Sequence, residues 1–132
     1  MYEILPHTAD VRVRLVAGDA RSLFRDGAAA LRDVVKPVVL PDSGDTITLT
    51  VEAHDLTSLL VDFLNELIWL LEARHLTPKQ VSVVELSEAK LVASLEMETA
   101  EGWERDVKAV TYHLAEVQLV GGAWTTTLVF DI

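Results

Sequence analysis

The chain contains no cysteine among its 132 residues. This absence excludes a disulfide-stapled scaffold, a thiolate zinc site, an iron–sulfur cluster and a cysteine nucleophile. Long apolar runs are missing as well. The longest stretch, residues 59–71, is interrupted by three polar side chains and is too short and too polar to span a bilayer. The amino-terminal segment lacks the basic and apolar regions of a signal peptide, so we expect a cytoplasmic protein.

Basic residues are scarce: 11 Lys and Arg stand against 21 Asp and Glu, and the net charge is −10. A field of that sign repels a phosphate backbone, so we expect no direct binding to nucleic acid. Attraction to cations and to basic protein surfaces is favoured instead. The chain also lacks the glycine-rich phosphate loops G-x-G-x-x-G and G-x-x-x-x-G-K-[ST] and the serine motif G-x-S-x-G.

Half of the residues are apolar, which is enough for one globular core, and we expect residues 1–132 to form a single domain. Helical spacing predicts two helices, one running from an Asp19 cap to about Val35 and one over residues 56–73. Alternating patterns predict strands over residues 10–17, 46–51, 81–86, 91–97, 113–120 and 123–131. Residues 99–104, which include a glycine, are expected to form a loop. This order predicts an α+β fold with two helices packed on a mainly antiparallel sheet.

The two ends of the chain carry candidate cation ligands. Asp131 lies at the end of a strand and is followed at once by the α-carboxylate of Ile132. Hard cations such as Ca²⁺ take oxygen ligands of this kind, although a solvated acidic tail has the same sequence. Near the other end, His7 and Asp10 lie where a turn is expected to become a strand. They could bind a cation or transfer a proton, or they could simply form a polar turn.

A third polar cluster contains Lys108, Tyr112 and His113. Lys108 could bind a phosphate or a partner's carboxylate, or it could simply neutralise local acid. On the second predicted helix, Trp69 lies opposite the apolar stripe. It is either a partner-binding anchor or covered by a second layer of structure, and we favour cover.

Four stretches of the chain together resemble the archease family. They are Tyr2-Glu3 with His7-Thr8-Ala9-Asp10, the helical segment Leu60–Leu67, Val107–His113 and the closing Val129-Phe130-Asp131-Ile132. Each motif alone is weak, but their order and spacing span nearly the whole chain. The resemblance implies a compact α+β accessory protein of the GTP-dependent RtcB-type RNA ligase, which promotes guanylylation and turnover of that ligase in tRNA splicing and RNA repair without being an enzyme itself.

The resemblance also implies a divalent cation, typically calcium, held by Asp10, the side chain of Asp131 and the terminal carboxylate of Ile132, with Lys108 as a further functional residue. It therefore predicts that the first and last strands meet with their acidic ends on the same side. One departure lies close to this site: where the family run has a glycine after the aspartate, this chain reads Val11-Arg12-Val13.

Two other functions remain open from the residues alone. One is a stand-alone metal-dependent hydrolase that uses Asp10, Asp131 and His7. The other is a chaperone-like binding module that uses Trp69 and apolar surface. Turnover of a substrate without any ligase would favour the first, and metal-independent protection of unrelated proteins from aggregation would favour the second.

Overall fold

The computed structural model describes residues 1–5 and 10–132, which contain two helices and nine strands. The helices are α1 (Ala20–Val35) and α2 (Leu56–Arg74). The strands are β1 (Tyr2–Leu5), β2 (Asp10–Ala17), β3 (Pro37–Leu40), β4 (Thr46–Glu52), β5 (Leu76–Leu86), β6 (Lys90–Trp103), β7 (Ala109–Thr111), β8 (Gln118–Val120) and β9 (Ala123–Asp131).

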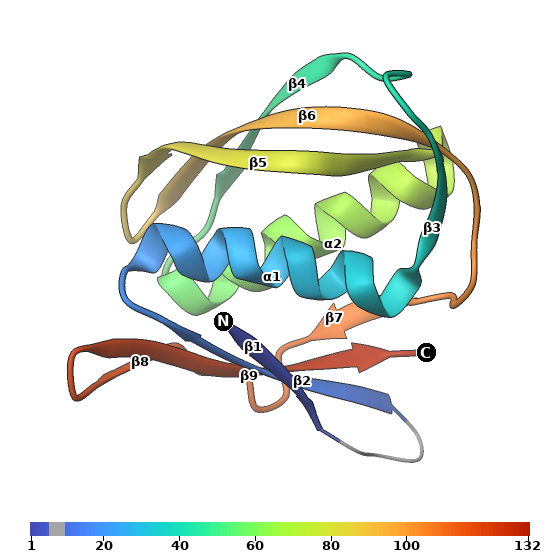
Figure 1. Ribbon diagram of the computed structural model, residues 1–132. Coiled ribbons are helices and arrows are strands. Elements are labelled where there is room, and N and C mark those ends of the chain that lie inside the picture. The colour runs from blue at the N-terminus through green and yellow to red at the C-terminus, as the bar shows by residue number, and fades with distance from the viewer. Residues whose placement is uncertain (6–9) are drawn as a thin grey trace.

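The strands form two antiparallel sheets, and the two helices lie between them (Figure 1). The first sheet has the order β1-β2-β9-β7, with β8 also paired to β9, and the second has the order β3-β6-β4, with β5 also paired to β6. Helix α1 contacts β2 of the first sheet and β5 of the second. The prediction of two helices packed on antiparallel strands is confirmed. The division into two sheets was not predicted, because hairpin signals do not say which sheet a strand joins.

The core lies on both sides of the helix layer. Phe24 of α1 and Phe63 of α2 meet with their ring centroids 5.9 Å apart, and both are almost fully buried. Helix α2 buries residues around most of its circumference, because both sheets and α1 pack against it. Trp69 is on its uncovered side, with 53% of its surface exposed, so the expectation of a covering layer there was wrong.

Both helices begin and end at the residues that favour such boundaries. The carboxylates of Asp19 and Asp55 each accept a hydrogen bond of 2.7 Å from the backbone N–H three residues later. These bonds satisfy an N–H that the helix itself leaves unpaired, and they lower the pKa of both carboxyl groups. At the other ends, Lys36 and His75 adopt left-handed backbone angles, with φ of 52° and 54°.

The expected loop over residues 99–104 was wrong, because β6 continues to Trp103 and pairs there with β3. The pairing passes from Gly102 to Ala100, so Glu101 forms a bulge opposite β3. A glycine within a strand often marks such a bulge, and it was mistaken here for the end of the strand. Strand β8 is also shorter than expected, whereas the Gly121-Gly122 turn has the predicted positive φ angles of 59° and 82°.

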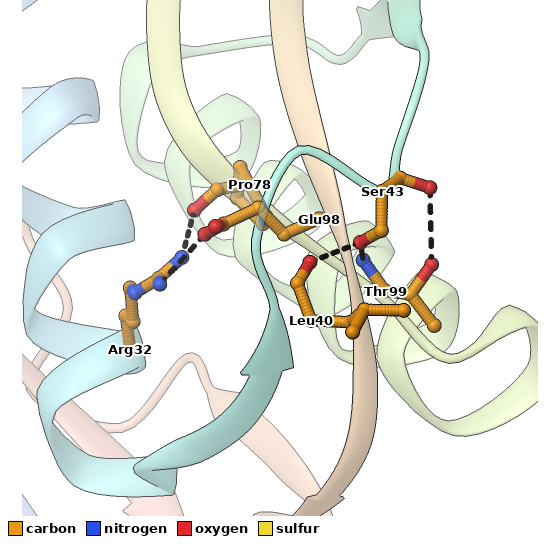
Figure 2. Close-up of polar contacts among 6 residues, drawn as sticks. All are labelled: Arg32, Leu40, Ser43, Pro78, Glu98 and Thr99. Atoms are coloured by element: carbon orange, nitrogen blue, oxygen red, sulfur yellow. Dashed lines mark hydrogen bonds and ion pairs between the residues drawn. The ribbon is translucent and has the colours of Figure 1, made fainter.

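Two arginines of α1 bind the backbone of β5. Arg21 Nη1 donates to the Val83 carbonyl at 2.8 Å, and Arg32 Nη1 donates to the Pro78 carbonyl at 2.9 Å. Each carbonyl lies beside a register shift of β5 against β6. Figure 2 shows that Arg32 also reaches Glu98 of β6, where its Nη2 lies 2.8 Å from the carboxylate. These bonds attach the helix layer to the second sheet.

In the described part of the chain, which leaves out residues 6–9, neither helix has the length and apolar character needed to cross a bilayer.

Candidate cation site

Asp10 and Asp131 lie directly opposite each other at the ends of β2 and β9. The two strands are antiparallel and stay in register over eight pairs, from Asp10–Asp131 to Ala17–Trp124. Residues opposite each other in such a pair have Cα atoms roughly 4.5–5.5 Å apart. The prediction that the first and last motifs converge with their acidic ends together is confirmed.

This pair of carboxylates lies on the face of the sheet that points away from the helices. The neighbouring pair, Val11 and Phe130, is buried against the helices, with 7% and 0% exposure. Because side chains alternate along a strand, Asp10 and Asp131 point to the opposite face. The Asp10 side chain is 19% exposed, and Asp131 is more open to solvent.

The backbone of Lys108 lies beside Asp131, just before a third strand. Ala109 of β7 pairs with Asp131, and the Lys108 N–H donates to the Asp131 carbonyl at 2.7 Å. The Lys108 side chain is exposed. His113, in contrast, follows the opposite end of β7 and is exposed there, so the structure does not bring it to the aspartates. His7 lies outside the described residues.

Helix α2 holds β7 in place through residues that the sequence analysis did not select. Asn65 Nδ2 donates to the Val110 carbonyl at 3.0 Å, and the Val110 N–H donates to Asn65 Oδ1 at 2.8 Å. The Tyr112 hydroxyl donates to Asp62 one turn earlier on the same helix, and this bond raises the pKa of Tyr112 to about 12. A signal for Asn65 was present, because it interrupts an otherwise apolar helical run.

Arg12 was also missed. It lies two residues after Asp10 on the same face of β2, and its Nε atom is 3.5 Å from Asp10 Oδ1. Its side chain is 30% exposed. The carboxylate that the sequence assigned to a cation is therefore already in an ion pair within the chain.

The residues present fit a hard divalent cation in ligand type, but they supply only two side-chain ligands among the described residues. Asp10 and Asp131 offer carboxylate oxygens on one face, which is the ligand type that Ca²⁺ and Mg²⁺ prefer. Outside residues 6–9, no three His, Asp or Glu side chains come together as a metal-binding group. A third oxygen ligand would have to come from groups other than these side chains, such as the main chain of Ile132, which follows Asp131 directly.

Comparison with known proteins places this chain in a family. The model of the archease protein family matches residues 2–132. Protein archease of Pyrococcus abyssi is 34% identical, covering 99% of this chain and 98% of its own, and that of Methanosarcina acetivorans is 33% identical, covering 99% and 95%. The chain belongs to the archease family.

Two solved structures have the same fold. The solution structure of Methanobacterium thermoautotrophicum protein 1598 has a TM-score of 0.70 at 27% identity and covers 99% of this chain and 98% of its own. A Thermotoga maritima archease, described as a possible chaperone, has a TM-score of 0.72 at 20% identity and covers 100% and 98%. The second likeness concerns the fold alone.

Proposed function

We propose that this protein is an accessory factor of a GTP-dependent RtcB-type RNA ligase, that it promotes guanylylation and turnover of the ligase, and that it does not join RNA itself. The observation that carries this proposal is the meeting of Asp10, Asp131 and Lys108 at one end of the first sheet. These are the residues to which the family resemblance assigns function, and they come from β2, from β9 and from the segment just before β7.

Asp10, Asp131 and the main-chain carboxylate of Ile132 would hold a divalent cation, which we propose to be calcium. A cation bound there would neutralise part of the negative charge of these carboxylates. The backbone of Lys108 lies beside Asp131, and its exposed ammonium group would contact a phosphate or a carboxylate of the ligase. The net charge of −10 favours docking on basic surface around a nucleotide pocket. Preferential binding to the guanylylation-competent state would raise the population of that state.

A guanylylation assay with the purified ligase, GTP and this protein tests the proposal. We expect Asp10→Ala to reduce the stimulation by at least about tenfold, as loss of a cation ligand does elsewhere. Asp45→Ala is the matched control, because Asp45 is an exposed aspartate just before β4, in the other sheet. Equal stimulation by both variants and by the unmodified protein would overturn the role of the carboxylates. A variant with one residue added after Ile132 tests the terminal carboxylate in the same assay.

A second candidate function, a chaperone-like module that binds other proteins, is favoured by one observation. Trp69 is 53% exposed on α2, and exposed tryptophan is typical of protein contact surfaces. Under this function, Trp69→Ala would abolish the protection of an aggregating client in the presence of EDTA, whereas Asp10→Ala would leave it unchanged. Under the ligase-accessory function, Asp10→Ala would instead lose the stimulation in the guanylylation assay, and Trp69→Ala would keep it.

A further inference from the structure

We propose that Arg12 is the internal counter-ion of the Asp10–Asp131 pair, and that a divalent cation binds this pair only by displacing the guanidinium from Asp10. The inference rests on the cation site of the proposed function. It concerns a residue that lies beside the expected ligands without being one of them.

The position of Arg12 in the sheet directs its side chain toward Asp10. Arg12 and Asp10 are two residues apart on β2, so both side chains leave the same face of the strand. Directly across from Arg12 stand Leu5 of β1 and Val129 of β9. Both of these cross-strand neighbours are apolar.

The charges at the site explain why such a counter-ion is useful. Asp10 and Asp131 are directly opposite each other on neighbouring strands, and like charges in that position destabilise strand pairing. The Asp10 side chain is four-fifths buried, so its repulsion from Asp131 is screened less than that of a fully exposed pair. A guanidinium 3.5 Å away offsets one of the two negative charges. Because arginine stays charged at any pH in a protein, this offset is permanent unless the side chain moves.

The contact between Arg12 and Asp10 makes cation binding less favourable. A cation that takes Asp10 as a ligand must compete with Arg12 for the carboxylate and then faces the positive charge of Arg12 at short range. The protein therefore exchanges one counter-ion for another instead of filling a bare acidic site. Two consequences follow: the affinity for calcium is lower than two carboxylates alone would give, and the sheet stays intact when calcium is absent.

Calorimetric titration of the purified protein with CaCl₂, without any ligase, tests this inference. We expect Arg12→Met to bind calcium about fivefold more tightly, the gain that corresponds to removal of one partly exposed ion pair. Arg14→Met is the matched control, because Arg14 is on the same face of the same strand but lies opposite Glu3 and Thr127. Both variants lower the net charge by the same unit, so a difference in calcium affinity between them reports that Arg12, and not Arg14, is next to Asp10. Arg12→Lys keeps the charge and should bind as the unmodified protein does.

Thermal unfolding in EDTA supplies a second measurement. Arg12→Met should unfold at a lower temperature than Arg14→Met in EDTA, and added calcium should remove most of that difference. If Arg12→Met does not fold, Arg12→Gln replaces it in both experiments. Equal calcium affinities for the Arg12 and Arg14 variants would overturn the inference and leave the cation site standing. Absence of calcium binding by every variant would overturn both.

Discussion

Asn65 of α2 exchanges two hydrogen bonds with the backbone of Val110, and through this contact the helix layer fixes β7, the strand that follows Lys108 and pairs with Asp131. Strand β7 has only three residues and pairs with β9 alone among the described strands, so few other contacts hold it. The family motifs of α2 and of residues 107–113 are thus one structural unit.

Replacement of Asn65 tests this unit. Asn65→Ala leaves both the N–H and the carbonyl of Val110 without a partner, and Val110 is only 2% exposed. Two unsatisfied groups of this kind predict a loss of about 2 kcal/mol in the free energy of unfolding. Urea unfolding measures the loss, and Glu66→Ala, at an exposed neighbouring position, is the control. Equal stabilities of the two variants would show that the contact contributes nothing.

The hydrogen bond between Tyr112 and Asp62 predicts a change of stability in alkali. It raises the pKa of Tyr112 from 10.0 to about 12 in the folded protein. The stabilisation is therefore complete below pH 10 and is lost as the pH rises through 12. Ultraviolet titration in a Tyr2→Phe background follows Tyr112 alone, because the chain has two tyrosines. Asp62→Asn should move the titration back toward pH 10, and an unchanged midpoint would contradict the assignment.

The helix caps predict the opposite behaviour in acid. Hydrogen bonds from the backbone lower the pKa of Asp19 and Asp55 below 3.8, the value of an unperturbed aspartate. Their stabilisation is present above that value and disappears as the pH falls through the lowered pKa. Asp19→Asn keeps an oxygen that accepts the Ser22 N–H but cannot titrate. Its stability should depend less on pH below 4 than that of the unmodified protein, as urea unfolding at several pH values would show.

The ion pair between Arg32 and Glu98 predicts that a single substitution lowers stability more than a double substitution does. Arg32→Met leaves the Glu98 carboxylate, which is 7% exposed, without its partner, and should cost about 2 kcal/mol in the free energy of unfolding. Adding Glu98→Gln should restore most of that loss, because no unpaired charge remains. Arg25→Met, at an exposed position on the same helix, should have little effect. A double variant as unstable as the single one would refute this account.

The sequence predicts a helix or strand correctly where its boundaries are set by residues close to it in the chain. The alternation of residues 10–17 and the Asp19 and Asp55 caps are observed as expected, because burial on one face and a missing N–H partner are local requirements. Strands β1 and β3 were missed, because each has four residues and its pairing is set by distant strands.

The candidate site shows the same division. Composition and spacing identify Asp131 as a candidate ligand, but nothing local joins it to Asp10, 121 positions earlier. Only the family resemblance predicted that they meet. Arg12 and Asn65 escaped notice because their importance depends on what lies beside them in space, a carboxylate in one case and a backbone in the other.

The hydrogen bonds of Arg21 and Arg32 to β5 restrict insertions in the helix and in the strand. The arginines are eleven positions apart on the helix, about 16 Å along its axis, and their acceptors, Pro78 and Val83, are five positions apart on the strand, again about 16 Å. Eleven residues of the helix and five residues of the strand thus span the same length. A residue inserted between the two arginines would rotate one of them away from its carbonyl. An insertion in either segment is therefore expected to break one of these two bonds unless the other segment lengthens by the same distance.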